Sequence, residues 1–369
     1  MQDDKEIHII GFGQAPSHGL KAGMVTNIDA TAQAITQAME EAQLMADCQI
    51  GSVVTGIAGN HIRSMNSQGV VKIKEGEVTQ TDIDRAIETA KAVNIPPDHQ
   101  ILHTVVQEYI IDNQPGVREP IGMSGVRLDT RIHIVTGAVT AMQNIQKCIE
   151  RCGLHIDNMI LQPLASGRAV LTEDEKELGV CVIDIGGGTT DIAVVNDGGV
   201  EGTKMFGIGG RSFTRTIAAD LDLSFKDAEK LKLNIDHDKL KPTVKKKVDA
   251  AIDKTLEVWL SGVELALGDF DNVDYLPNRI LLCGGGSSLK KITEALKERQ
   301  WPEDLPFTKK PVVQYINPSD VTGIVDETGD ASDHTFVTAM GLLRVGYDTI
   351  IGSQGGNSLV EKVNRLLKI

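Results

Sequence analysis

The stretch Val182-Ile183-Asp184-Ile185-Gly186-Gly187-Gly188-Thr189-Thr190-Asp191-Ile192 decides the fold of this 369-residue chain. An apolar run ends at an acidic residue, and glycines, threonines and a second apolar run follow. The pattern predicts two strands joined by a glycine-rich loop. Glycines let backbone N–H groups approach phosphate oxygens closely, and hydroxyl groups add donors. The predicted phosphate contacts are Gly186, Gly187, Gly188, Thr189 and Thr190.

Asp184 ends the first apolar run, where its carboxylate can hold a magnesium ion or the waters around it. A plain β-hairpin is the competing interpretation, but hairpins favour two-residue turns over a five-residue Gly/Thr loop. The loop lacks the Gly-Lys-Ser/Thr that ends a Walker loop, and it leads into a strand rather than into the helix of a dinucleotide fingerprint. The sequence therefore predicts Asp184 as a metal ligand in a different kind of phosphate site.

Two further glycine turns follow. Residues 280–283 are typical of a strand that leads into a helix, so that a base or ribose can pack against bare backbone. Residues 207–211 precede another helix. The predicted nucleotide contacts are Gly284, Gly285, Gly286 and Ser287 in the first of these turns, and Gly209 and Gly210 in the second. Glu229 and Lys232 are candidates for nucleoside contacts, although a solvated helix face also explains such a charged run.

The rest of the chain alternates predicted strands and helices, which is typical of an α/β protein. We expect one helix capped by Asp29 and another that begins with Thr79 and Asp82 as a capping pair. Two separate strands are expected at 101–106 and 109–112.

Composition narrows the function classes. The net charge of −14 would repel a phosphate backbone, so nucleic-acid binding is not expected. Residues 1–6 have no signal-peptide core, and no apolar run reaches the length of a membrane-spanning helix. The odd count of five cysteines favours reduced thiols. Cys148 and Cys152 have helical spacing, but no second pair of ligands follows, so no metal is assigned to them.

In this order, the three turns resemble the nucleotide site of the actin superfamily. Residues 184–191 resemble its second phosphate motif, and residues 282–287 resemble its adenosine motif. Residues 165–171 and 336–343 resemble the helices that cross between the two halves of that fold. The resemblance implies an α/β actin-like ATPase fold, with two related halves around a nucleotide cleft and ATP and Mg²⁺ as cofactors.

Within this superfamily, the chain resembles the FtsA family of bacterial cell-division proteins most closely. The likeness is carried by residues 42–50, 107–109, 171–175 and 177–181, and is densest up to about residue 200. It implies a peripheral protein on the cytoplasmic face of the inner membrane at the division septum. Such a protein forms filaments, tethers the FtsZ ring and recruits other division proteins. Any ATPase activity is expected to be weak, and no residue is assigned a catalytic role.

The resemblance also implies how the chain divides. The first half is expected at 1–51 and 133–165, the inserted FtsA-type α/β subdomain at 52–132, the second half at 166–213 and 278–351, a reduced helical subdomain at 214–277, and a linker with an amphipathic tail at 352–369.

The tail carries the predicted membrane contact. Apolar residues recur at helical spacing with basic residues toward the other side, which suits an anionic leaflet. The predicted membrane residues are Leu359, Val360, Lys362, Val363, Arg365, Leu366, Leu367 and Lys368. A terminal helix packed on its own core is the alternative, but the glycines of 352–356 favour a detachable helix. So short a helix binds marginally and needs the avidity of a polymer.

The chain departs from the family pattern in three places. It begins at about the third strand, so the first phosphate loop is absent, and we expect fewer contacts to Mg²⁺ and β-phosphate and an exposed strand edge. Residues 230–248 are too few for the strand-rich part that receives the FtsZ tail in the family. The two parts of the chain also resemble different branches of the family.

Two other functions remain open on the same fold. A pilus-assembly adaptor of the PilM kind binds a partner's cytoplasmic peptide and has no membrane helix of its own, so the tail distinguishes it. A sugar or acetate kinase needs an acidic base near the N-terminal region and a polar substrate pocket, and the sequence supplies neither.

Overall fold

The computed structural model describes residues 6–352, apart from 171–174, 176–177, 197–198, 238–239, 271–272, 299–300, 302 and 322. The predicted membrane residues of the tail lie outside the described residues. Among the helices that are described, none is both long enough and apolar enough to cross a bilayer.

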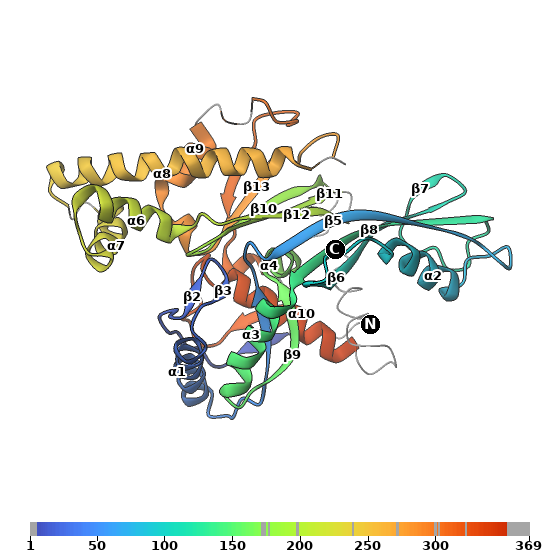
Figure 1. The fold of residues 1–369 in the computed structure, drawn as a ribbon, viewed down its shortest axis with the longest axis horizontal. Coiled ribbons are helices and arrows are strands. Elements are labelled where there is room, and N and C mark those ends of the chain that lie inside the picture. The colour runs from blue at the N-terminus through green and yellow to red at the C-terminus, as the bar shows by residue number, and fades with distance from the viewer. Residues whose placement is uncertain are drawn as a thin grey trace.

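The glycine-rich stretch lies in a sheet that has five strands among the described residues, in the order β12-β11-β10-β13-β14 (Figure 1). The strands are β10 (Val180–Ile185), β11 (Thr190–Asn196), β12 (Gly199–Phe206), β13 (Arg279–Cys283) and β14 (Val312–Tyr315). As predicted, β10 and β11 form an antiparallel pair around the glycine loop, and β10 is also parallel to β13. Every residue of β10 is buried, which is typical of a strand whose sheet is covered on both faces.

Helices cover both faces of this sheet. Alternate residues of β10 point to opposite sides. Val182 joins a core cluster on one face that includes residues of α4 (Gln162–Val170) and α10 (Val337–Gly352). Ile183 joins a second cluster on the other face that includes residues of α6 (Gly210–Leu221), α8 (Pro242–Gly268) and α9 (Lys290–Glu298). The second half is therefore a three-layered α/β unit.

The first half is smaller. Its described strands form separate pairs, β1 (Ile7–Ile9) with β15 (Ile324–Asp326) and β4 (Ser52–Ile57) with β9 (His155–Leu161). The other elements are the hairpin β2 (Leu20–Lys21) and β3 (Met24–Val25), α1 (Ile28–Ala46) and α3 (Val139–Arg151). Helices α1 and α3 pack together, and Thr31 is the buried residue of α1. This half therefore has a thin core around the crossing helices.

A second α/β unit projects from the body, to the right in Figure 1. Its antiparallel strands are β5 (Ile62–Lys72), β8 (Arg127–Ala138), β6 (His99–Ile111) and β7 (Gln114–Val117), in that order, and α2 (Gln80–Lys91) covers the sheet. The predicted capping box of Thr79 and Asp82 starts α2. We call this unit the insertion.

The remaining described elements are α7 (Phe225–Asn234), which packs against α6, and the short helices η1 (Ile235–His237), η2 (Gly285–Ser288) and η3 (Pro318–Asp320).

Several predicted elements differ from the structure. The first helix is capped by Asn27, whose Oδ1 accepts from the Ala30 N–H at 3.0 Å, and not by Asp29. The strands predicted at 101–106 and 109–112 are one strand, β6, because register shifts absorb the polar residues between them. Strand β12 was not predicted, because its glycines and charged residues are poor strand formers and pairing with β11 imposes the conformation.

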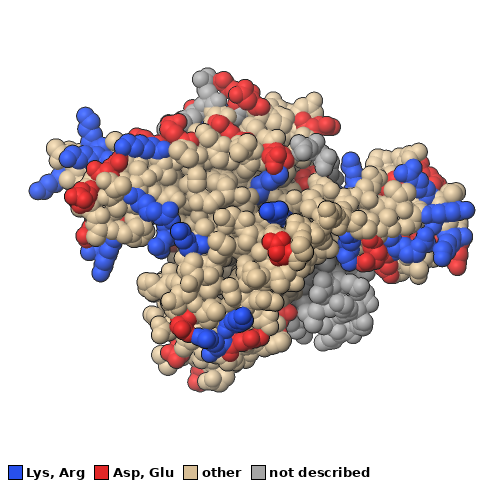
Figure 2. All heavy atoms as spheres, viewed as in Figure 1, with Lys and Arg blue, Asp and Glu red and all other residues tan. Residues whose placement is uncertain are grey.

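Lys and Arg side chains gather at two ends of the face in Figure 2, around α7 and the start of α8 and on the insertion. Many have acidic neighbours. Lys254 lies 2.6 Å from Asp220, and Arg127 lies 2.7 Å from Asp129. These positive charges are compensated locally, by the buried carboxylate of Asp129 and by the partly exposed carboxylate of Asp220.

Candidate functional site

The three glycine turns meet at one place beside the end of β10. Gly209 is the N-cap of α6, and a Cβ built on it would lie 2.5 Å from the Gly186 carbonyl oxygen. The Gly210 N–H donates to that same oxygen at 3.0 Å. A Cβ built on Gly210 would lie 3.6 Å from the Gly286 Cα. Bare backbone therefore lines a single site built from segments that are far apart in the sequence.

The loop between β10 and β11 is shorter than predicted, because Thr190 pairs with Ile185 as the first residue of β11. Residues 186–189 form the loop. Within the described part of the chain, the N–H groups of Gly187 and Gly188 have no hydrogen-bond acceptor. Adjacent N–H groups of this kind form a concave anion site.

The turn after β13 packs directly on the end of β10. Gly284 has a φ of 80°, and a Cβ there would lie 2.3 Å from Asp184 Oδ1, so the position requires glycine. Gly285 begins η2. A Cβ on Gly286 would lie 2.6 Å from Ile185 Cγ2. The predicted adenosine turn and phosphate loop are therefore in contact.

The first half reaches the same place through the tip of the β2–β3 hairpin. A Cβ built on Gly188 would lie 3.1 Å from the Ala22 Cα. On its other side, a Cβ built on Gly23 would lie 2.0 Å from the Ala58 carbonyl oxygen, which is beside the start of the insertion. The glycine loop is thus bordered by both halves.

Two buried carboxylates face each other below the loop. Asp184 and Asp191 are directly paired across β10 and β11, so their side chains share one face of the sheet. Asp184 accepts a hydrogen bond from Thr338 Oγ1 at 2.6 Å, and Asp191 accepts one from Thr189 Oγ1 at 3.0 Å. No donor among the described residues reaches the second oxygen of Asp191, Oδ1, which is buried.

Burial raises the pKa of both carboxyl groups. For Asp184, hydrogen bonds from Thr338, Ser166 and Cys283 oppose the rise in pKa. For Asp191, the nearby charge of Asp184 adds to the effect of burial, and the pKa lies well above its usual value. Two like charges in a dry site are costly unless a proton or a cation compensates them. The pair therefore fits Mg²⁺, which prefers carboxylate oxygens.

Asp184 is also tied to the two crossing helices. Ser166 of α4 donates to Thr338 Oγ1 of α10 at 3.1 Å, and Thr338 donates to Asp184. The helices approach closely, since a Cβ on Gly341 would lie 2.2 Å from the Ala165 carbonyl oxygen. The segments predicted to cross between the halves therefore contact the candidate site directly.

Glu229 and Lys232 lie on α7, beside the start of α6. Lys232 Nζ donates to the Gly210 carbonyl oxygen at 3.0 Å and lies 3.0 Å from the Glu229 carboxylate. Thr214 donates to Glu229. The largely buried Lys232 thus holds a positive charge beside the backbone-lined site, which favours an anion there.

Two predicted contacts use their hydroxyl groups in internal hydrogen bonds. Thr190 is fully buried, donates to the Ile208 carbonyl oxygen at 2.7 Å and accepts from Trp259 Nε1 at 2.8 Å. Ser287 is also fully buried and donates to the Gly284 carbonyl oxygen at 2.7 Å. The side chains of Thr190 and Ser287 therefore brace the turns, which corrects the prediction that they face a nucleotide.

Asp191 is the candidate cation ligand that the sequence analysis missed. A hairpin whose loop is 186–189 places Asp184 and Asp191 opposite each other, so the spacing contained the signal. Ser166 and Thr338 gave no signal, because only the tertiary fold brings them to Asp184.

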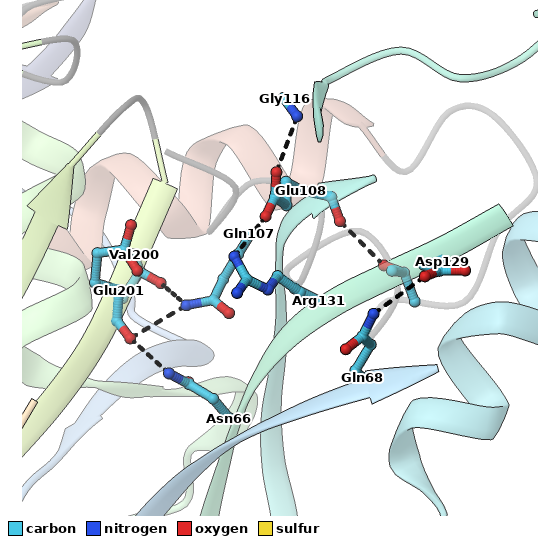
Figure 3. Close-up of polar contacts among 10 residues, drawn as sticks. Asn66, Gln68, Gln107, Glu108, Gly116, Asp129, Arg131, Val200 and Glu201 are labelled. Atoms are coloured by element: carbon cyan, nitrogen blue, oxygen red, sulfur yellow. Dashed lines mark hydrogen bonds and ion pairs between the residues drawn. The ribbon is translucent and has the colours of Figure 1, made fainter. Parts of the chain in front are cut away.

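A polar cavity of about 860 Å³ lies away from the glycine turns, between the insertion and the edge strand β12. Figure 3 shows the side chains of the insertion that reach β12. Asn66 Nδ2 donates to the Glu201 carbonyl oxygen at 3.1 Å, and Gln107 Nε2 donates to the Val200 carbonyl oxygen at 2.9 Å. The insertion therefore protects the open edge of the large sheet with side-chain donors.

Comparison with known proteins identifies the family. The family model described as "SHS2 domain inserted in FTSA" matches residues 59–136, and the one described as "Cell division protein FtsA" matches residues 181–341. A cell division protein FtsA of Neisseria meningitidis serogroup B is 54% identical over 368 residues, which cover 93% of this chain and 85% of that relative. The chain belongs to the FtsA family of cell-division proteins.

Other FtsA proteins match a shorter part of the chain. FtsA of Pseudomonas aeruginosa is 54% identical over 230 residues, and FtsA of Escherichia coli K12 is 44% identical over 230 residues. The chain spans 55% of the length of each, and 62% of the chain is matched. For the Neisseria relative, the likeness continues over nearly the whole chain, beyond the first 200 residues in which it was expected to be densest.

A solved structure supports the fold. The "PilM-PilN type IV pilus biogenesis complex" contains a chain with a TM-score of 0.64 and 18% identity, covering 90% of this chain and 89% of that one. FtsA family membership and this similarity confirm the predicted α/β actin-like ATPase fold.

Asp191→Asn is expected to stabilise the protein more at pH 8 than at pH 5. Because the pKa of Asp191 is raised, the folded state keeps a proton that the unfolded state releases. The contribution of this proton to the stability of the wild type is therefore lost as the pH rises from the ordinary pKa of aspartate through the raised pKa of Asp191. Asparagine removes this loss. Urea denaturation without divalent cations, at both pH values, measures the free energy of unfolding.

Asp82→Asn is the matched control with the opposite pKa shift. Hydrogen bonds from Thr79 lower the pKa of Asp82. Its contribution to the free energy of unfolding is therefore fully present at pH values above the ordinary aspartate pKa, and it is lost only as the pH falls through the lowered pKa. Asp82→Asn should therefore destabilise the protein about equally at pH 5 and pH 8. If Asp191→Asn also changed the free energy of unfolding equally at pH 5 and pH 8, Asp191 would not have the raised pKa that its burial beside Asp184 implies.

Proposed function

We propose that this chain binds ATP with Mg²⁺ at the junction of the three glycine turns. The supporting observation is that the N–H groups of Gly187 and Gly188, which have no acceptor among the described residues, lie beside the buried pair of Asp184 and Asp191. The N–H groups would bind phosphate oxygens, and Lys232 would add positive charge. The two carboxylates would hold Mg²⁺, which when bound neutralises phosphate charge.

The contacts of Asp184 suggest what nucleotide binding would change. Its hydrogen bond from Thr338, which also contacts Ser166, joins the site to α10 and α4. A ligand that shifts Asp184 would therefore act on the helices that cross between the halves. We assign no catalytic base, so nucleotide state would control assembly and any ATPase activity would be weak.

The cellular function that fits best is that of an FtsA-type adaptor. In this proposal the chain tethers the FtsZ ring to the cytoplasmic membrane at the septum, forms filaments and recruits other division proteins. Family membership supports this function. Residues 358–369 would make the membrane contact, on the strength of their basic amphipathic sequence. In the family, a strand-rich part is expected to receive the FtsZ tail. The described elements between Gly210 and Gly268 are helical, so the FtsZ contact is not assigned to residues.

A PilM-like adaptor is the weaker candidate. The likeness to the PilM–PilN complex concerns the fold, at 18% identity. The Neisseria FtsA matches a similar share of this chain, 93% against 90%, at the much higher identity of 54%.

Gly187→Asp is expected to weaken ATP binding by about tenfold or more, because a carboxylate would repel the phosphates at close range. A Cβ at this position would meet only the Arg211 side chain, at 3.8 Å, so the variant should fold. Isothermal titration with ATP and Mg²⁺ measures the affinity. Gly187→Ala is the matched control and should bind within about twofold of wild type, since only a methyl group is added. Equal affinity of both variants and wild type would remove the phosphate loop from the site.

Purified FtsZ is expected to sediment with anionic lipid vesicles only when this chain is present. Deletion of residues 358–369 should leave both proteins in the supernatant, because the basic amphipathic segment supplies the attachment. Vesicles of phosphatidylcholine alone are the control for electrostatic attraction. Undiminished sedimentation by the deletion variant would refute the tail as tether. If the chain sedimented with the vesicles while the added FtsZ stayed in the supernatant, the proposed partner would be refuted.

A further inference from the structure

Helix α8 reaches the glycine loop through one buried side chain, Trp259. Its Nε1 donates to Thr190 Oγ1 at 2.8 Å, and that hydroxyl donates to the Ile208 carbonyl oxygen at 2.7 Å. Trp259 and Thr190 are fully buried. A continuous hydrogen-bonded chain therefore joins α8, the exit of the glycine loop and the turn before α6. We call these three groups the tryptophan relay.

The direction of every hydrogen bond in the relay is fixed. An indole N–H can only donate, so the Thr190 hydroxyl must accept from Trp259 and give its own hydrogen to Ile208. The residues next in sequence belong to the candidate site, since Thr189 precedes Thr190 and Gly209 follows Ile208. The Thr190 hydroxyl group therefore adds a side-chain hydrogen bond to the backbone bonds that join two of the three turns.

A second contact holds α8 at the same place. Gly262 lies about one turn beyond Trp259, and a Cβ there would lie 2.9 Å from Cε2 of the Phe206 ring. Phe206 is paired with Thr190 across β12 and β11. Glycine inside a helix is less favourable than alanine, and this close approach explains its presence. Helix α8 is therefore pressed against the strand ends that carry the loop.

We propose that Trp259 is a positioning residue of the nucleotide site and that its indole senses whether the site is filled. Trp259 would not touch the ligand, because it is bonded to Thr190, which follows the glycine loop in sequence. The inference rests on the proposed binding of nucleotide at the glycine loop. A phosphate bound at Gly187 and Gly188 would order the loop, and the change would reach the indole through a single hydrogen bond.

The sequence contains a matched control, because the chain has two tryptophans. Trp301 is buried in the same core cluster as Trp259. Its Nε1 donates to the Leu296 carbonyl oxygen at 2.9 Å, at the end of α9 and outside the relay. Trp301→Phe leaves Trp259 as the sole indole, and Trp259→Phe leaves Trp301.

The test uses the full chain, with ATP and Mg²⁺ as the probe. Calorimetric titration of wild type first decides whether nucleotide binds. At saturation, tryptophan emission of the Trp301→Phe variant should change in intensity or wavelength, whereas emission of the Trp259→Phe variant should stay constant. The spectroscopic comparison separates a relay that senses the site from a core residue that only adds stability.

Affinity provides the second readout. Thr190→Val keeps the shape but removes the hydroxyl, and it should weaken ATP binding about fivefold, as expected for one lost internal hydrogen bond. Trp259→Phe should weaken binding similarly. Thr190→Ser keeps the hydroxyl and should bind within about twofold of wild type, as should Trp301→Phe.

Each contrary outcome has a defined meaning. If wild type binds no ATP, the proposed nucleotide site and the relay both fail. If wild type binds ATP but the emission of Trp259 does not respond, only the relay fails. The relay also fails if Thr190→Val and Trp259→Phe bind ATP as tightly as Trp301→Phe does.

Discussion

Two like charges buried opposite each other constrain the centre of this protein. Asp184 and Asp191 are brought together by the pairing of β10 and β11, and the sheet excludes water from both. Asp184 accepts hydrogen bonds from the hydroxyl groups of Thr338 and Ser166, and Asp191 accepts one from Thr189. These donors do not offset burial, which raises the pKa of both carboxyl groups, and the charge of Asp184 raises the pKa of Asp191 further. The fold therefore leaves a place for compensating positive charge directly below the glycine loop.

The surrounding architecture serves to hold that place rigid. The strands that carry the pair are covered by helices on both faces. Helices α4 and α10 contact Asp184 through side chains, and α8 braces the loop exit through Trp259. The insertion protects the open edge of the same sheet through Asn66 and Gln107. Movement at the loop can thus reach α4, α10 and α8 through the side-chain contacts of Asp184 and Thr190.

Much of the fold could be predicted because its signals are local. The apolar run, the glycines and the second apolar run of 182–192 predict a strand, loop and strand without further context. The same is true of the capping box at Thr79. The roles of Thr190 and Ser287 could not be predicted, because each depends on the hydrogen-bond partners that tertiary packing supplies. Strand β12 was missed for a similar reason, since a partner strand rather than its own residues makes it extended.

The candidate site was predicted as a set of turns, and its chemistry emerges only from their assembly. Asp191 appeared in the decisive stretch, yet its importance follows from facing Asp184 in a dry environment. The glycines at 209 and 284 are explained by distances to segments that the sequence does not place nearby. Sequence therefore located the site, and the three-dimensional arrangement identified which of its residues can hold a cation.

The most direct test of the central claim is the proton balance of ATP binding, measured by calorimetry from pH 5 to pH 7 in buffers of different ionisation enthalpy. A cation that binds between carboxylates of raised pKa competes with their protons. The account predicts that binding needs Mg²⁺ and releases protons, and that Asp191→Asn reduces this release. Binding that is equally tight in excess EDTA and exchanges no protons with the buffer would contradict it.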